Sequence, residues 1–142
     1  MKRLTACFLL LVALILTLPV PGYSADDAKS EDLKVVVYYF HGDRRCKTCN
    51  AIESNSKALL DSVFAEQMKS GIIEWRVRNT DEKEHAHFEK DFNLLFGSVV
   101  AVKMKDGKQV EWKNLQKVWE LVWDKDEFNS YLETEVKAYL AP

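Results

Sequence analysis

The stretch that decides the fold is residues 35–49, with the sequence VVVYYFHGDRRCKTC. Residues 35–40 are an unbroken run of β-branched and aromatic side chains, which is typical of a strand buried on both faces. Residues 41–45 predict a loop. Cys46 and Cys49 follow, and apolar residues then recur at roughly helical spacing. We therefore expect a buried strand, a loop and an amphipathic helix, with the two cysteines where the loop meets the helix.

The rest of the chain alternates between strand and helix patterns. The helix after Cys49 should end before Gly71, and Asp106-Gly107 should form the turn of a hairpin. The other predicted elements are strands at residues 72–77, 99–104 and 109–112, a helix that carries Phe88 and Phe92 and could extend to Leu95, and helices at residues 115–123 and 125–140. The order β-α-β-α-β-β-α-α predicts an α/β fold with a central mixed sheet and helices on both faces.

Two of these helices begin with the spacing of a capping box. Asp81 precedes Glu84 by three residues, and Asp124 precedes Glu127 by three. In a capping box the first side chain accepts from a backbone N–H group of the first helical turn. We therefore expect one helix to begin at Asp81 and the last helix to begin at Asp124.

The predicted topology places the cysteines at one edge of the sheet. The first two strands are joined through a helix of about five turns, so they should be parallel with a right-handed crossover. Cys46 then takes the last loop position at the carboxyl edge, and Cys49 lies in the first helical turn. Unpaired amide groups and the helix dipole stabilise a thiolate at this position. Arg44, Arg45 and Lys47 should add positive charge nearby.

This setting points to thiol chemistry. A thiolate is the reactive form of cysteine, and such surroundings lower the thiol pKa from ~8.5 to ~3.5–7.5. We expect Cys46 to attack a disulfide and Cys49, which lies further inside, to resolve the mixed disulfide. His41 is placed to tune Cys46 or to carry protons, because its unperturbed pKa is near neutrality. A loop histidine bonded to the backbone is the alternative interpretation.

The first 24 residues have the pattern of a secretory signal. Lys2 and Arg3 precede an apolar stretch at residues 7–18, and Pro19 and Pro21 follow it. Cleavage fits after residue 24 or 25. An uncleaved anchor is the alternative, but the apolar stretch is shorter than the ~20 residues that a membrane span needs. We expect residues 25–32 to be a polar lead-in, residues 33–142 to be one domain, and the protein to be exported to a periplasmic or other extracytoplasmic compartment.

Removal of this segment changes the charge and the cysteine count. The remaining chain has 18 basic and 22 acidic residues, a net charge of about −4, and nothing in that balance favours a nucleic acid or an anionic membrane as partner. Cys7 is also lost, so both remaining cysteines belong to one C-x-x-C. A bridge that closes so short a loop constrains little of the unfolded chain. The pair therefore indicates chemistry or half of a metal site.

Residues 33–140 resemble a thioredoxin fold. Cys46-Lys47-Thr48-Cys49 takes the active-site position of that family, and residues 105–108 take its β-hairpin. More narrowly, residues 38–42, Arg45-Cys46, Thr48-Cys49 and Ile52-Glu53 are similar to a set of small exported bacterial thioredoxin-like proteins. Some of these are described as subunits of a nitrophenyl-compound nitroreductase associated with arsenic-resistance genes. The resemblance implies thiol-disulfide exchange with a protein partner, exported or membrane-embedded, without a cofactor.

Three departures from thioredoxin affect what the resemblance implies. The cis-proline of the family, which presents backbone to the substrate, would fall at about Ser98 or Val99, and no proline is there. The tryptophan before the first cysteine is replaced by Arg45. The buried acid of the first strand aligns near Phe40, so His41 or Glu53 would have to replace it in deprotonating the second cysteine.

Three function classes follow from these residues. The first is an exported thiol-disulfide oxidoreductase or electron-transfer protein, the second is a non-catalytic subunit that docks a larger redox enzyme, and the third is a soft-metal carrier. Two thiolates suit Cu(I) or Zn(II) but do not complete a tetrahedral site. We interpret His85 and His87 as solvated surface and expect no resident metal, because helical residues two apart point in different directions. Trp123 would mark a partner surface if exposed.

Overall fold

The computed structural model describes residues 32–141, so the predicted signal segment and nearly all of the predicted lead-in lie outside the described residues. The elements are β1 (Leu33–His41), α1 (Lys47–Val63), α2 (Ala65–Ser70), β2 (Ile73–Asn79), α3 (His87–Asp91), β3 (Ser98–Lys105), β4 (Lys108–Asn114), α4 (Val118–Leu121) and α5 (Lys125–Leu140). None of the helices within this range is both long enough and apolar enough to cross a membrane.

A four-stranded mixed sheet in the order β2-β1-β3-β4 forms the centre of the domain. β1 pairs in parallel with β2, from Val35 opposite Ile73 to His41 opposite Asn79. It pairs antiparallel with β3 on its other side, and β4 is antiparallel to β3. The predicted α/β class, the mixed sheet, the parallel first pair and the order of strands along the chain are confirmed.

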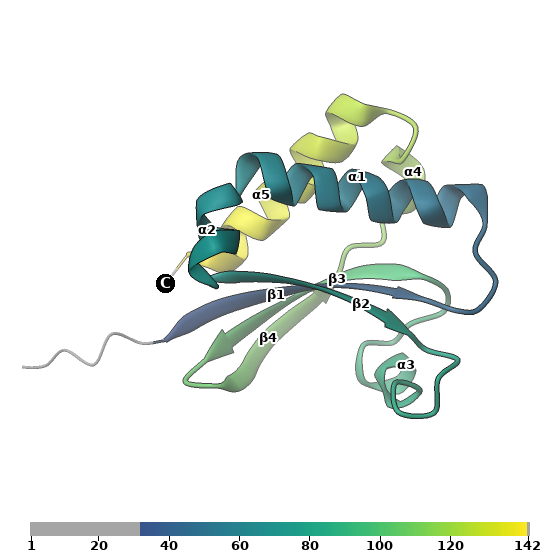
Figure 1. Ribbon diagram of the computed structural model, residues 1–142, viewed down its shortest axis with the longest axis horizontal. Coiled ribbons are helices and arrows are strands. Elements are labelled where there is room, and N and C mark those ends of the chain that lie inside the picture. The colour runs from purple at the N-terminus through teal and green to yellow at the C-terminus, as the bar shows by residue number, and fades with distance from the viewer. Residues whose placement is uncertain (1–31, 142) are drawn as a thin grey trace, which may run out of the picture. The chain divides into compact units, whose positions relative to one another are not determined.

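β1 is buried on both faces, as its run of apolar residues predicts. Each of residues 35–40 is at most 9% exposed. Val35, Val37 and Tyr39 join the larger core, which also takes residues from α1, α4 and α5, whereas Val36, Tyr38 and Phe40 join a second core with Phe92. Figure 1 shows α1, α2, α4 and α5 on one side of the sheet and the short α3 on the other. Helices therefore cover both faces, but unequally.

The helix expected between the dithiol and Gly71 is divided in two. Phe64 separates α1 from α2 with non-helical backbone angles of φ −115° and ψ 27°. Its side chain is only 2% exposed and belongs to the larger core. The chain turns at the residue whose ring enters the core, and hydrophobic periodicity alone does not reveal that turn. Gly71 ends α2 with φ 78°, as predicted.

The two predicted capping boxes have different outcomes. At Asp124, an oxygen of the carboxylate accepts from the backbone N–H of Glu127 at 3.1 Å, and α5 begins where predicted. At Asp81 the prediction is wrong, because α3 begins only at His87 and has no side-chain cap. The Asp81 carboxylate instead accepts from the backbone N–H of Asp43 at 2.6 Å. A contact to a loop 38 residues away has replaced the local cap.

The chain after the hairpin also differs in part from expectation. Asp106 and Gly107 have φ values of 48° and 74°, and positive φ at both central residues is what a two-residue hairpin turn of type I′ requires. The helix expected over residues 115–123 is reduced to α4 (Val118–Leu121). Leu115 does not enter the helix, because its N–H donates to the carbonyl oxygen of Val99 at 2.8 Å and so extends the contact with β3.

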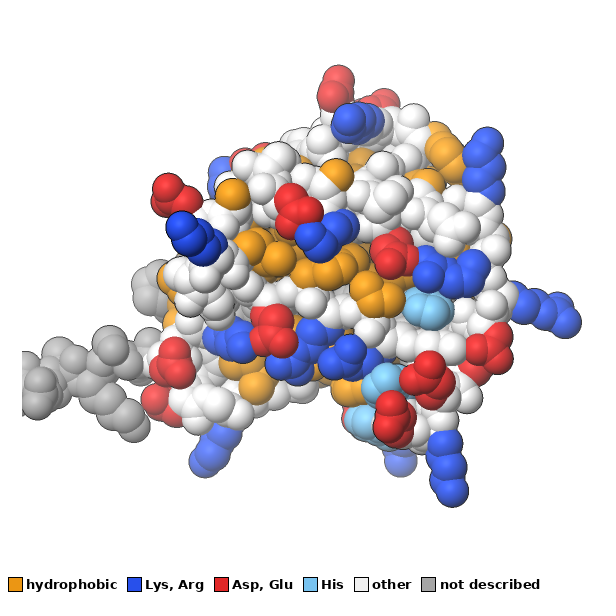
Figure 2. Space-filling view, viewed as in Figure 1, with side chains coloured by type: hydrophobic (Ala, Val, Ile, Leu, Met, Phe, Trp, Pro, Cys, Tyr) orange, Lys and Arg blue, Asp and Glu red, His pale blue; other side chains and the backbone are white. Residues whose placement is uncertain are grey.

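An ionic network lies along the edge strand β2, where Figure 2 shows basic side chains with acidic ones among them. Glu74 forms ion pairs with Lys34 and Arg76, and Arg76 donates to the Tyr38 hydroxyl at 3.0 Å. Hydrogen bonds from Arg76 and then Lys34 lower the pKa of Glu74 to about 2. Because this pKa is below the ordinary value of 4.5, Glu74 stabilises the folded state above pH 4.5.

The contribution of Glu74 should be lost as the pH falls from 4.5 towards 2, where the folded protein must also bind the proton. We expect Glu74→Gln to lower the free energy of unfolding at neutral pH and to flatten its fall over that window. Chemical denaturation at several pH values tests this, with Glu133→Gln as the control, because Glu133 pairs with Lys137 on α5. Equal slopes for wild type and Glu74→Gln would contradict the prediction.

Candidate active site

Cys46 occupies the N-cap position of α1. Its backbone is extended (φ −86°, ψ 167°), and its sulfur accepts from the backbone N–H of Cys49 at 3.0 Å. The two cysteines form a disulfide with 5.0 Å between their Cα atoms. Cys46 is exposed, and Cys49 is half-buried in the first turn of the helix. Both cysteines thus lie where the sequence predicts, with Cys46 more exposed than Cys49.

The backbone of α1 provides the main favourable charge around Cys46. The first amide groups of a helix have no partner inside the helix, and the helix dipole is positive at this end. The first turn of α1 contains no acidic residue. A negative charge on Cys46 would therefore meet N–H donors without a neighbouring carboxylate in that turn.

Contacts with the end of β2 hold the loop that carries Cys46. Asn79 donates to the Asp43 carboxylate at 2.7 Å, and the N–H of Asp43 donates to Asp81 at 2.6 Å. A Cβ atom at Gly42 would lie 2.9 Å from the Asp81 carboxylate, so a larger residue would displace this contact. Sequence reasoning missed these contacts, because they join the loop after β1 to the end of β2 and the loop that follows it, and no local motif connects those segments.

The predicted positive side chains are largely engaged by neighbours. Arg45 forms an ion pair with Glu53 on α1 and lies 5.7 Å from the centroid of the Tyr39 ring. The Lys47 amine lies 5.4 Å from the centroid of the Trp123 ring. Arg44 is exposed. Glu53 therefore offsets the positive charge of Arg45. The same ion pair makes Glu53 less suited to accept a proton from Cys49, which was one of the two possibilities that the sequence allowed.

His41 lies at the end of β1, half-buried. Its Nδ1 atom is 2.9 Å from the carbonyl oxygen of Gly42, and its ring is stacked on Tyr39 with 6.0 Å between centroids. In the neutral tautomer that protonates Nδ1, this nitrogen donates to the carbonyl and Nε2 is the free acceptor. Nδ1 of His41 is therefore bonded to the backbone, as the alternative interpretation expected. Nε2 is the nitrogen that could exchange a proton.

Tyr39 contacts the dithiol helix and was missed by the sequence analysis as a site residue. Its hydroxyl donates to the carbonyl oxygen of Cys49 at 2.8 Å, and burial raises the pKa of the phenol. Phe40, near which the resemblance would place a buried acid, lies on the other face, where its ring packs on Phe88 and Phe92. Strand alternation could have identified Tyr39, because it places Tyr39 on the same face of β1 as Val35 and Val37.

The loop before β3 forms one side of the site. The structure has no cis peptide bond among residues 32–141, and Ser98 is buried at the start of β3. A Cβ atom on Gly97 would lie 3.7 Å from the Tyr39 hydroxyl, so this loop is adjacent to the tyrosine that contacts Cys49. The Trp119 indole N–H donates to the carbonyl oxygen of Gly97 at 2.8 Å. A tryptophan thus holds the backbone of this loop in the absence of a cis-proline.

Large apolar side chains are exposed on the loop that leads to Gly97 and at Trp123, next to Lys47 of the C-x-x-C. Leu95 is 85% exposed and Phe96 is 52% exposed, in the loop that leads to Gly97. Trp123 is 63% exposed and contacts Lys47, which lies between the two cysteines. We call Leu95, Phe96 and Trp123 the apolar rim. Large apolar side chains exposed on a surface favour contact with another molecule.

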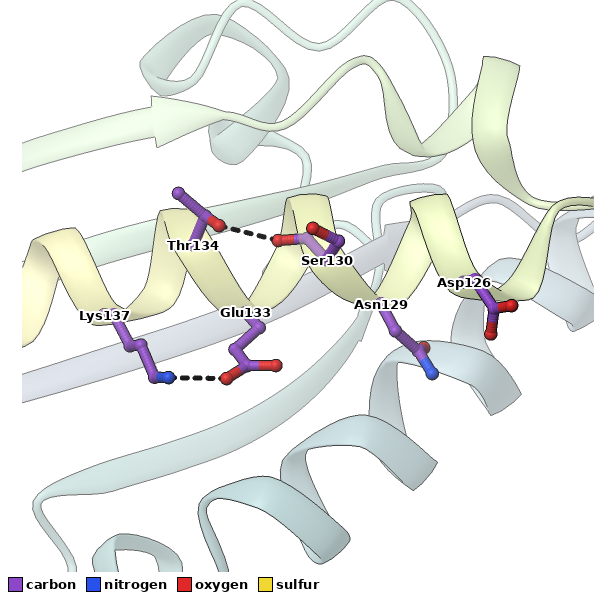
Figure 3. Close-up of a pocket in the computed structure, with 6 residues that line it drawn as sticks. All are labelled: Asp126, Asn129, Ser130, Glu133, Thr134 and Lys137. Atoms are coloured by element: carbon purple, nitrogen blue, oxygen red, sulfur yellow. Dashed lines mark hydrogen bonds and ion pairs between the residues drawn. The ribbon is translucent and has the colours of Figure 1, made fainter.

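A surface hollow and a group of potential metal ligands in the described chain lie apart from the two cysteines in the sequence. A hollow of about 370 Å³ lies on α5, and Figure 3 shows that its six lining residues all come from this one helix. Two of its polar contacts are local, from Thr134 to Ser130 and from Lys137 to Glu133. Among residues 32–141, a group of three potential metal ligands occurs at Glu82, Glu84 and His85. The two sulfurs belong to no such group within that range.

No protein-family model matches this chain, and no curated protein sequence matches it. Among solved structures, the chain is similar to Fasciola hepatica thioredoxin, with 17% identity and a TM-score of 0.43 over 75% of this chain and 81% of that one. It is also similar to a structure described as a malarial protein, with 16% identity and a TM-score of 0.45 over 76% of this chain and 99% of that one. Both likenesses concern the fold alone.

The Arg45–Glu53 pair makes the electrostatics of Cys46 testable. Glu53→Gln would leave Arg45 without its carboxylate partner, and uncompensated positive charge favours a thiolate. We expect the alkylation rate of the reduced protein, plotted against pH, to shift its midpoint downward by about half a unit. Asp61→Asn is the matched control, because Asp61 pairs with Lys57 further along α1. An unchanged midpoint in Glu53→Gln would show that the pair does not act on Cys46.

Proposed function

We propose that the protein is a thiol-disulfide oxidoreductase or electron-transfer protein that works through Cys46 and Cys49. The observation that carries the proposal is the N-cap position of an exposed Cys46, bonded to a half-buried Cys49 whose N–H donates to the Cys46 sulfur. A cysteine in this position is predisposed to be a nucleophile, and its partner is placed to close the disulfide.

The proposed exchange transfers two electrons in two steps. The Cys46 thiolate attacks a disulfide of the partner, forming a mixed disulfide and releasing one partner sulfur as a thiolate that takes up a proton. Cys49 then loses its proton and attacks the Cys46 sulfur, which forms the Cys46–Cys49 disulfide and releases the second partner sulfur. The partner is reduced, the dithiol is oxidised, and an external dithiol restores it. The reverse sequence oxidises a partner dithiol by the same bonds.

The apolar rim supports a protein as the partner and favours a second candidate function. Leu95, Phe96 and Trp123 are exposed, and Trp123 lies next to Lys47 of the C-x-x-C. A small thiol would not need such apolar contacts. A subunit that docks a larger redox enzyme would use the same surface without needing the cysteines. The two functions differ in one respect, because docking alone should survive loss of both sulfurs.

Single serine variants test the proposed roles of the cysteines. After reduction and incubation with a disulfide-bonded protein such as insulin, Cys49→Ser should accumulate a mixed disulfide through Cys46. Cys46→Ser should accumulate far less, because Cys49 is half-buried and lacks the N-cap position. Mass spectrometry of the trapped species identifies the sulfur, and circular dichroism checks that both variants are folded. Equal trapping by the two variants, or trapping mainly through Cys49, would contradict the proposal.

The apolar rim should matter only when the substrate is large. We expect Trp123→Ala to slow reduction of insulin by about tenfold, the effect of losing roughly 1.4 kcal/mol of contact. Reduction of oxidised glutathione should change little. Val110→Ala is the control, because Val110 is also exposed but lies on β4 beside the hairpin, at the opposite end of the sheet. If Trp123→Ala slows both substrates equally, the rim does not bind the partner.

A further inference from the structure

Two hydrogen bonds act on Cys49 from opposite sides of its Cα atom. Its backbone N–H donates to the Cys46 sulfur at 3.0 Å. Its carbonyl oxygen accepts from the Tyr39 hydroxyl at 2.8 Å. The first bond is the donor that a Cys46 thiolate would use, and the second ties the same residue to the central strand of the sheet. Any movement of Cys49 changes both bonds together.

The Tyr39 hydroxyl is a fixed point in the structure. Tyr39 is 0% exposed, and its strand β1 lies between β2 and β3 in the sheet. Its ring is stacked on Trp75 with 6.4 Å between centroids and an interplanar angle of 7°. Arg45 lies over the ring and is itself paired with Glu53 on α1. These contacts fix the Tyr39 ring on β1. Its hydroxyl can therefore hold the start of α1 at a fixed position relative to β1.

The first turn of α1 needs such an anchor. Helix ends fray, and their amide groups are held only by capping contacts. Here the cap is the reactive sulfur itself, and its bond to Cys49 N–H changes character whenever the disulfide opens or closes. The bond from Tyr39 to the Cys49 carbonyl does not involve either sulfur. It can therefore keep the first turn in place through the redox cycle.

We propose that Tyr39 is a positioning residue for the dithiol. Its hydroxyl holds Cys49 so that the Cys49 N–H stays directed at the Cys46 sulfur and the Cys49 sulfur stays within reach of a mixed disulfide. This inference rests on the proposed thiol exchange. It assigns the orienting role to the residue next to Phe40, on the face of β1 that packs against α1.

Tyr38 provides a matched control on the same strand. Tyr38 precedes Tyr39 and faces the second core, and its hydroxyl accepts from Arg76 at 3.0 Å. Tyr38→Phe and Tyr39→Phe each remove one hydroxyl and one hydrogen bond from β1 and keep the ring. Only Tyr39→Phe removes a contact with α1.

The test is the alkylation rate of the reduced protein as a function of pH. Tyr39→Phe is expected to move the midpoint upward by about half a unit, roughly a threefold loss of thiolate below the midpoint. It should also lengthen the lifetime of the mixed disulfide, whereas Tyr38→Phe should leave both readouts at the wild-type values. Thermal unfolding of the three proteins measures the structural cost of each change separately.

Two outcomes would overturn the assignment in different ways. If Tyr39→Phe keeps the wild-type midpoint and mixed-disulfide lifetime, or if Tyr38→Phe shifts them equally, the Tyr39 hydroxyl has only a structural role. If wild-type Cys46 itself is alkylated like free cysteine, the proposed function fails first, and the positioning role fails with it. The wild-type profile therefore separates the two failures.

A measurement on the unaltered chain covers the case in which Tyr39→Phe does not fold. The Tyr39 hydroxyl proton should exchange slowly with water in nuclear magnetic resonance spectra of both the oxidised and the reduced protein. It should also show proximity to the backbone of Cys49 in both states. Loss of this signal on reduction would show that the bond is absent in the state that reacts, and would overturn the proposal.

Discussion

Burial of β1 on both faces is the constraint on which the rest of the structure depends. Residues 35–40 are covered on one side by α1, α4 and α5 and on the other by α3 and its aromatic neighbours. β1 is also hydrogen-bonded to strands along both edges. The chain that leaves it must emerge at the carboxyl edge of the parallel pair and return over one face as α1. Cys46 sits at that point of return.

The electrostatics of the site therefore arise mainly from the backbone. Arg45 is compensated by Glu53, and Lys47 is engaged with the Trp123 ring. The N–H of Cys49 and the open end of α1 remain directed at the Cys46 sulfur. A site built in this way depends on the orientation of backbone N–H groups rather than on charged side chains. It also needs the first helical turn to be held in position, which links the chemistry to the packing of β1.

The predictions that were confirmed depend on residues close together in the sequence, and those that were wrong depend on residues far apart in it. The hairpin turn at Asp106-Gly107 and the Asp124 cap depend on residues within four positions of one another, and both are confirmed. The cap predicted at Asp81 failed because Asp43, from another loop, bonds to that carboxylate. The helix break at Phe64 was missed for a related reason, since the core that receives its ring is assembled from distant segments.

The sequence by itself determined the element order, the buried first strand and the position of both cysteines at the start of a helix. Each of these follows from the periodicity of apolar residues and from local backbone chemistry. Only the tertiary structure decided which side chains surround the dithiol. Strand alternation places Tyr39 and Phe40 on opposite faces of β1, but only the packing of the helices decides that Tyr39 faces the dithiol helix and Phe40 the opposite core. The pairing of Arg45 with Glu53 and the contact of Lys47 with Trp123 likewise exist only once the helices have packed on the sheet.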